Sequence, residues 1–158
     1  MSIEEEPTDA HEQPAAERLR RLCRLIGEPA FTASDYRVGR VTHIVLLRFA
    51  AAVPAAERAG AVQAFLSLKD DCQRQGVPYI RSIEHGTQQS GEDATGGFEH
   101  AFIMTFASEG DRNYYVGEPL VNDPACHDLA HHAFKAMIGA KLAPGGVVVF
   151  DYYSAELA

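Results

Sequence analysis

Four short stretches in residues 41–153 carry the hydrophobic patterns of β-strands. They are residues 41–49, 79–86, 98–106 and 147–153. In the first, third and fourth stretches the odd and even positions are both largely apolar, which is typical of strands that are covered on both faces. We therefore expect a sheet that is buried on its two sides.

Helical segments are expected between these strands. One begins after Pro54 and ends at the Gly-Val-Pro sequence of residues 76–78. Residues 87–97 are polar and rich in glycine, as in a flexible loop. A helical turn is expected at residues 109–115 and a helix at residues 125–141. The order β-α-β-β-α-β predicts an α+β chain with a ferredoxin-like antiparallel sheet.

Apolar side chains at both the odd and the even positions of the strands predict a homodimer. Helices cover one face of such a sheet, so the second apolar face would be exposed in a monomer. Two protomers that pack these faces together would form a dimeric α/β barrel, with the homodimer interface through the sheet face.

Residues 1–40 have a different pattern, and we interpret them as an N-terminal extension of a domain at residues 41–154. Residues 1–13 contain five acidic and no basic side chains, which predicts a disordered acidic tail. Residues 15–26 place apolar side chains at spacings of three and four, with four arginines on the other side, so a short amphipathic helix is expected. Residues 28–40 are interpreted as a connector.

Composition narrows the classes of function. The 158 residues carry 14 basic and 22 acidic side chains, a formal net charge of −8, whereas nucleic acids and anionic membranes favour basic partners. The three cysteines form no CxxC pair, which is typical of reduced thiols in a cytoplasmic protein. The first residues lack the features of a signal peptide, and no apolar run could span a bilayer. We expect a cytoplasmic protein that binds no nucleic acid and no membrane.

Three motifs, in this order, carry a family resemblance. They are HIVLLRF at residues 43–49, FEHAFIMTF at residues 98–106 and VVVFDYY at residues 147–153. With a histidine-rich helix start before the last of them, they make the chain similar to the stress-responsive dimeric α/β-barrel family, abbreviated Dabb. Some members are stress proteins without established chemistry, and others are polyketide cyclases of the olivetolic acid cyclase type. The resemblance implies the dimeric fold, a small-molecule substrate, a cofactor-free aldol closure and no cofactor.

The resemblance also assigns a catalytic tyrosine and a catalytic histidine. The tyrosine of the cyclases lies nine residues after the last phenylalanine of the third strand, which gives Tyr115, with Tyr114 as the neighbouring alternative. The histidine lies in a Pro-Ala-His-x-x-Phe pattern, which gives His131, and a second partial match makes His127 its rival. Imidazole titrates near neutral pH, so His131 would accept a proton from carbon. Tyr115 would donate a hydrogen bond to the carbonyl that becomes an enolate.

Other polar residues interrupt the apolar strands. His43 and His100 occupy corresponding positions of the first and third expected strands. The resemblance implies that both line a cavity and bind substrate. Histidines in such positions are also common as hydrogen-bonded core residues. Asp151 would orient a histidine such as His43, unless it is a solvated carboxylate at the strand end. His127 and His131 have the spacing of a metal-chelating pair, but the sequence fixes no third ligand, so we expect no metal.

Two further functions fit the same sequence. One is a non-catalytic stress-responsive or ligand-binding dimer, and the other is a cofactor-free monooxygenase acting on an aromatic polyketide. The sequence has no GxSxG, P-loop or GxGxxG motif, so esterases, kinases and dinucleotide enzymes are not indicated. A cavity lined by His43, His100, Tyr115 and His131 would favour the cyclase-like enzyme, and a filled interior would favour the non-catalytic dimer.

Overall fold

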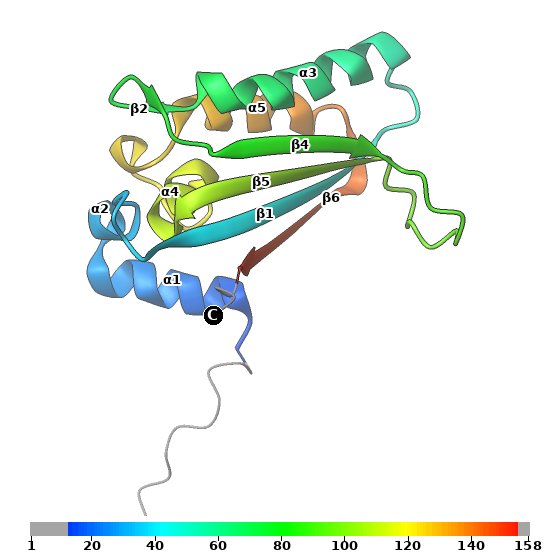
Figure 1. Cartoon of the computed structure of the whole chain (residues 1–158). Coiled ribbons are helices and arrows are strands. Elements are labelled where there is room, and N and C mark those ends of the chain that lie inside the picture. Colours follow the sequence, from blue (N-terminus) through cyan, green and yellow to red (C-terminus); the bar gives the residue numbers. More distant parts are fainter. Residues whose placement is uncertain (1–12, 155–158) are drawn as a thin grey trace, which may run out of the picture.

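A four-stranded antiparallel sheet forms the centre of the computed structural model, which describes residues 13–154 (Figure 1). The strands are β1 Val38–Phe49, β4 Ser82–Thr87, β5 His100–Ser108 and β6 Leu142–Tyr153, in the spatial order β4-β5-β1-β6. The ferredoxin-like α+β fold is confirmed. Nearly all of the predicted acidic tail lies outside the described residues.

Helices cover one face of this sheet (Figure 1). The long helix α3 Ala55–Asp71 packs against α5 Leu129–Gly139 and against β4, while α4 Glu109–Val116 packs against β1 and β5. Helix α1 Ala15–Ile26 has the predicted bounds, and its start lies beside the end of β6 (Figure 1). None of the helices within residues 13–154 has the length and hydropathy needed to cross a membrane.

The core lies between the sheet and these helices. Odd positions of β1 and even positions of β5 point toward the helices, and Val45 stands opposite Phe102 in the ladder with both side chains buried. The Phe102 ring stacks on Phe65 of α3, with centroids 3.8 Å apart. The alternation predicted from the sequence therefore separates a helix-facing side from an open side of the sheet.

The open side of the sheet keeps exposed apolar side chains. Ile103 of β5 and Val148, Phe150 and Tyr152 of β6 belong to this side, and all four are exposed. An apolar face of this kind is unusual on an isolated soluble domain. The second apolar face predicted from strand parity is thus present.

Helix boundaries in the second half differ from the prediction. The helix expected at residues 125–141 is divided into a 3₁₀ turn, Pro124–Cys126, and α5, which begins at Leu129. The cause is Asp128, whose carboxylate accepts hydrogen bonds from the backbone N–H groups of Ala130 and His131 and so caps a new helix. His127 therefore precedes α5 and does not share a helix face with His131.

The connector and the end of α3 also hold elements that the sequence pattern did not predict. The connector at residues 28–40 contains α2 Glu28–Phe31 and the first residues of β1. After α3, the short strands β2 Gln73–Arg74 and β3 Val77–Pro78 pair in a small ribbon. Neither segment is long enough to show a periodic pattern.

A second apolar cluster attaches the N-terminal extension to the sheet domain. Its buried members are Cys23 of α1, Phe31 of α2, and Val121 and Cys126 of the segment that follows α4. The Asn113 amide of α4 donates a hydrogen bond to the Phe31 carbonyl at 2.9 Å. The extension is therefore packed against the domain at its α4 end.

Candidate functional site

A mostly apolar cavity of about 630 Å³ lies between α1, α4, α5 and β6. Its size is in the range that holds small-molecule ligands. The charged and imidazole side chains in its lining are Arg18, His43, Arg112, Glu118, His131, Lys135 and Asp151. Three of the residues singled out in the sequence, His43, His131 and Asp151, are thus brought together here.

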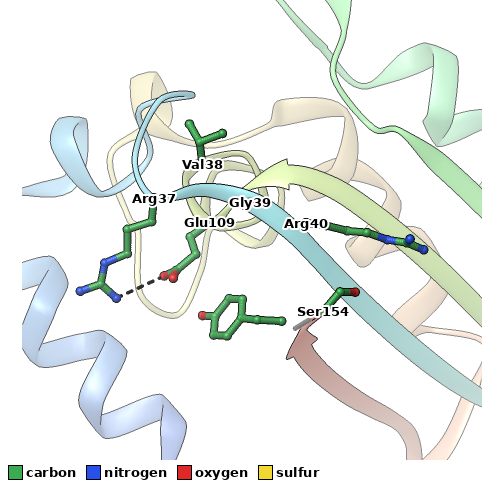
Figure 2. Close-up of a pocket in the computed structure, with 7 residues that line it drawn as sticks. Arg37, Val38, Gly39, Arg40, Glu109 and Ser154 are labelled. Carbon is green, nitrogen blue, oxygen red and sulfur yellow. Dashed lines mark ion pairs between the residues drawn. The ribbon is translucent and has the colours of Figure 1, made fainter. Parts of the chain in front are cut away.

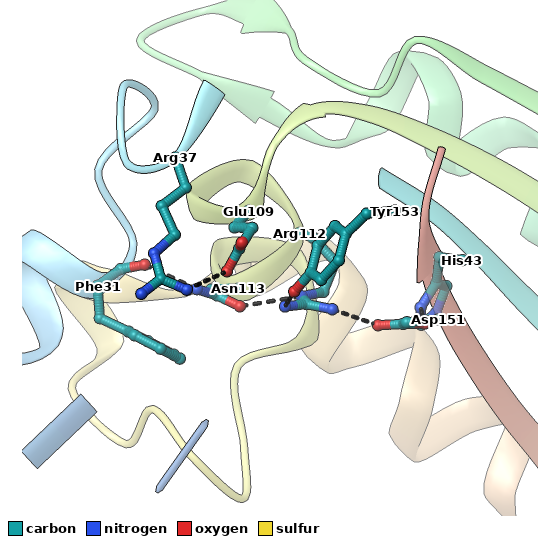
Figure 3. A network of polar contacts seen from close by, with 8 residues as sticks. All are labelled: Phe31, Arg37, His43, Glu109, Arg112, Asn113, Asp151 and Tyr153. Carbon is teal, nitrogen blue, oxygen red and sulfur yellow. Dashed lines mark hydrogen bonds and ion pairs between the residues drawn. The ribbon is translucent and has the colours of Figure 1, made fainter. Parts of the chain in front are cut away.

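His43 and Asp151 form the closest polar pair of this cavity (Figure 3). They stand opposite each other in the ladder between β1 and β6, and Nδ1 of His43 lies 2.5 Å from a carboxylate oxygen of Asp151. The ionised carboxylate can only accept, so Nδ1 carries the proton and donates. This arrangement leaves Nε2 of His43 as the nitrogen that can act as a base.

Arg112 of α4 holds the other oxygen of Asp151 (Figure 3). Its guanidinium donates to Asp151 at 2.6 Å and to the Asn113 side-chain oxygen at 2.9 Å, and it lies 3.5 Å from the Tyr153 hydroxyl. Burial alone would raise the pKa of Asp151, but the hydrogen bond from His43 and the charge of Arg112 outweigh burial and lower it. Asp151 therefore stays ionised and keeps His43 in one tautomer and orientation.

His131 is fixed by a different kind of partner. Its Nδ1 lies 2.5 Å from the backbone carbonyl of Tyr115, and its ring stacks on the Tyr115 ring with centroids 3.6 Å apart. Burial lowers the pKa of His131 to about 3 despite the bond to that carbonyl. The imidazole is therefore neutral at physiological pH, with Nδ1 protonated, and the bond from Nδ1 to Tyr115 is its one side-chain hydrogen bond within residues 13–154.

Tyr115 lies behind His131 and does not line the cavity. It is 1% exposed, and its ring also meets the edge of His43 with centroids 5.7 Å apart. Burial raises the pKa of Tyr115 well above its usual value, and the neighbouring Cys72 and Asp128 raise it further. Tyr115 is therefore placed to hold the two histidines, and its phenol stays protonated.

Tyr114 faces another part of the molecule. The guanidinium of Arg74 lies 4.2 Å from the centre of its ring, and Tyr79 packs edge-on against it. Burial raises the pKa of Tyr114, with a contribution from Asp128. Tyr114 is not among the residues that line the cavity.

His100 and His127 are also separated from the cavity. His100 lies at the other end of the helix-facing side, where its Nδ1 is 3.0 Å from Nε2 of His85 and its ring meets Phe49. His127 is buried, its ring stacks near His132, and its Nδ1 has no partner within the described residues. Of the four residues whose joint lining of a cavity would favour the cyclase-like enzyme, His43 and His131 line this cavity, and Tyr115 and His100 do not.

The fold and these motifs agree with the comparison against protein families. The model of the stress-responsive A/B barrel domain, Dabb, matches residues 41–154. The chain belongs to the Dabb family. No curated protein matched this Dabb chain.

Solved structures with the same fold include a plant enzyme. The hydroxynitrile lyase from Passiflora edulis is 20% identical, with a TM-score of 0.59, over 76% of this chain and 97% of the enzyme. A protein from Arabidopsis thaliana is 21% identical, with a TM-score of 0.59, over 75% and 98% of the two chains. A dimeric ferredoxin-like protein of unknown function from Jannaschia is 20% identical, with a TM-score of 0.53, over 72% and 98%. These likenesses concern the fold of the Dabb chain.

Three cationic residues of the Dabb cavity, Arg18, Arg112 and Lys135, were missed as site residues in the sequence. Arg112 lies three positions before Tyr115 on α4, and Lys135 lies four positions after His131 on α5, so each shares a helix face with a residue that the resemblance had assigned. Helical spacing applied to those two residues would have found both. The Lys135 ammonium donates to the carbonyls of Val116 and Glu118 at 2.8 and 3.2 Å, and burial lowers its pKa.

A second cavity, of about 410 Å³, lies at the start of β1 in the Dabb chain (Figure 2). Arg37 and Glu109 form an ion pair in its wall at 3.6 Å. Tyr153 belongs to the lining of both cavities, and it bonds Arg112 on the side of the first. None of the residues selected in the sequence lines this second cavity.

One group of residues in the described part of the Dabb chain has the spacing of a metal site. Glu28, Asp123 and Cys126 place one ligand atom each within 4.8 Å of one another. The two oxygens of Glu28 accept hydrogen bonds from the backbone N–H groups of Asn122 and Asp123, which explains the position of this carboxylate by itself. The group lies outside the 630 Å³ cavity.

Proposed function

We propose that this Dabb chain is a cofactor-independent enzyme that moves a proton on an apolar, carbonyl-rich small molecule, in an aldol-type formation or cleavage of a carbon–carbon bond. The observation that carries this proposal is the Asp151–His43 pair in the wall of a mostly apolar cavity. An apolar cavity holds the body of such a substrate, and the oriented imidazole supplies the base.

The reaction assigned to His43 is a proton transfer in two directions. Nε2 of His43 takes a proton from the carbon between two carbonyl groups, and the electron pair of that C–H bond forms the enolate. The enolate carbon bonds to the carbon of a further carbonyl group of the substrate. The resulting alkoxide takes the proton back from the imidazolium. The Asp151 carboxylate stabilises the imidazolium during this cycle.

We assign the base to His43 and not to His131, to which the family resemblance assigned that role. An effective general base has a pKa near the working pH, and His131 has a pKa of about 3. We therefore propose that neutral His131 accepts a hydrogen bond from a substrate hydroxyl through Nε2. Tyr115 is then a positioning residue for His131, through its ring and its backbone carbonyl.

The hydroxynitrile lyase of the same fold supports this class of chemistry. Cleavage of a hydroxynitrile also needs one base, which takes the hydroxyl proton while the carbon–carbon bond breaks and cyanide leaves with the electron pair. The imidazolium then protonates cyanide. One histidine in an apolar cavity can therefore serve as the base in both the aldol reaction and this cleavage.

We also propose that the functional unit is a homodimer in the cytoplasm. The exposed apolar side chains Ile103, Val148, Phe150 and Tyr152 form a continuous face for a second copy of the sheet. The Jannaschia protein of the same fold is described as dimeric, which supports the same assembly here. The three thiols are free in the structure, as is common in a reducing compartment.

Release of benzaldehyde tests the proposed function. Mandelonitrile and 4-hydroxy-4-phenylbutan-2-one both give benzaldehyde on cleavage, so one absorbance assay follows both. His43→Ala should lower turnover by roughly 10²- to 10⁴-fold, the usual contribution of a general base. His132→Ala, an exposed histidine on the same helix as His131, is the control. Binding of both compounds without turnover by the unmodified protein would favour the ligand-binding dimer instead.

A further inference from the structure

Helix α1 lies outside the part of the chain that matches the Dabb family, yet it forms a wall of the candidate cavity. The family match begins at residue 41, whereas α1 ends at Ile26. Ala15, Ala16, Arg18 and Leu19 of α1 all line the cavity. This wall is therefore an addition of this chain to the Dabb domain.

The packing of the extension holds this wall in place. Leu19 and Leu22 of α1 pack on the apolar cluster around Phe31 and Val121, and the Cys23 thiol lies 3.5 Å from the Leu120 carbonyl. The Glu28 carboxylate, just after α1, accepts two hydrogen bonds from the backbone of residues 122–123. The extension therefore also fixes the segment after α4, which supplies Pro119 and Leu120 to the cavity.

The charges in the cavity leave one cation without a partner in the described part of the chain. Arg112 is paired with Asp151 at 2.6 Å. Lys135 donates to two backbone carbonyls, and the charge of Glu118 acts on it. The guanidinium of half-buried Arg18 makes no ion pair and no hydrogen bond within residues 13–154, where only the backbone N–H of this residue donates, to Pro14.

We propose that Arg18 is a specificity residue that binds an anionic head group, a carboxylate in the first instance, of a ligand whose apolar body fills the cavity. An arginine can bind a carboxylate through two parallel N–H···O bonds, and such charge-assisted bonds are strong where water is partly excluded. Ala15 and Ala16 have small side chains, so the start of α1 leaves room beside Arg18. This inference rests on the proposed function, since it names the class of ligand for the same cavity.

Binding of a matched acid and ester tests this proposal. The probes are 4-oxo-4-phenylbutanoate and its methyl ester, which share an aryl ketone and differ in charge, and titration calorimetry with the full chain gives the dissociation constants. The unmodified protein should bind the acid more tightly than the ester. Arg18→Gln should weaken binding of the acid by about tenfold or more and leave the ester within about twofold. Arg18→Lys should keep part of the preference.

Two further variants separate recognition from packing. Arg20→Gln removes an exposed charge from the same helix and should leave both dissociation constants unchanged. Ala16→Trp places bulk in the wall and should weaken binding of acid and ester alike. Equal loss of acid and ester affinity in Arg18→Gln, or no preference for the acid in the unmodified protein, would overturn the role of Arg18. Failure of the proposed function has a different signature, since the unmodified protein would then show no turnover, or His43→Ala would keep full turnover, while the acid preference persists.

Discussion

His43 on β1 and Asp151 on β6 stand directly opposite each other across two neighbouring strands, with Nδ1 of the imidazole 2.5 Å from the carboxylate. Such a pair is set by the sheet register, so its geometry does not depend on a loop. Arg112 from α4 reaches the second oxygen of the same carboxylate at 2.6 Å. The sheet and the first helix after β5 thus meet at one ionised group in the cavity wall.

Replacing this carboxylate by an amide should disable the base with little change in shape. In Asp151→Asn one side-chain atom must donate, so the residue no longer accepts from both His43 and Arg112. We expect turnover on the benzaldehyde-releasing probes to fall by roughly 10²- to 10⁴-fold. Loss of the partner of a buried guanidinium should also cost about 3 kcal/mol of stability.

Kinetics and urea unfolding measure these two effects, and ¹⁵N NMR reports the tautomer of His43. Asp93→Asn is the matched control, because Asp93 is exposed in the loop between β4 and β5 and its positive φ is one that asparagine also adopts. Turnover in Asp151→Asn within a few-fold of the unmodified protein would remove Asp151 from the reaction.

The burial of His131 predicts a pH dependence of stability. Its pKa is about 3 in the folded protein and about 6.5 in an unfolded chain, so the unfolded state binds more protons between these values. The free energy of unfolding should therefore fall as the pH is lowered from about 6.5, by about 1.4 kcal/mol per pH unit for this group.

Urea titrations between pH 7 and pH 4 on the unmodified protein and on His131→Asn isolate this contribution. Asparagine can still donate to the Tyr115 carbonyl through its amide, but it does not titrate. The two stability curves should converge as the pH falls. Parallel curves would show that His131 accepts a proton in the folded protein as easily as in the unfolded chain.

The fold was predictable because its strands leave a strong local pattern. Alternation in β1 and β5 fixes which side chains face the helices, and the apolar open face follows from the same parity. The start of α5 was misplaced because the apolar and histidine residues around it continue a helical spacing. Helix α5 begins where it does because the Asp128 side chain caps it. Which of two positions the helix starts from depends on the packing of the preceding segment.

The site was predictable only in part. Spacing relative to a known pattern selected His131, and the position of His43 within its strand selected His43. The direction of the Tyr115 ring was not predictable, because it depends on how α4 is rotated against the sheet. Arg18 could not be found, because contact between α1 and the cavity arises from tertiary packing and leaves no mark in the local sequence. The separation of His43 from His100 follows from the register, which places His100 of β5 opposite Leu47, four residues along β1 from His43.

Gly110 is expected to be the most sensitive glycine of the junction between the extension and the domain. A Cβ atom at this position would lie 1.7 Å from the carbonyl oxygen of Ala33 and 3.2 Å from the Tyr36 side chain. Because that oxygen belongs to backbone, Gly110→Ala should cost about 3 kcal/mol and lower the melting temperature. Gly60→Ala, in open space on α3, should instead be neutral or stabilise the protein by about 0.5 kcal/mol. Equal melting temperatures for the two variants would contradict the close packing of residues 33–36 on α4.

A charge on the open face should dissociate the proposed homodimer. Val148 lies on that face, opposite Leu46 in the ladder, and is 40% exposed. In a symmetric dimer each substitution appears twice, so Val148→Glu would bring two carboxylates into an apolar contact, where burial without a partner is costly. We expect Val148→Glu to sediment as a monomer at concentrations at which the unmodified protein is a dimer, while its circular dichroism stays unchanged. Val77→Glu, which adds the same charge to an exposed valine of the β2–β3 ribbon, should remain dimeric. A dimer that survives Val148→Glu would show that the contact between copies uses another surface.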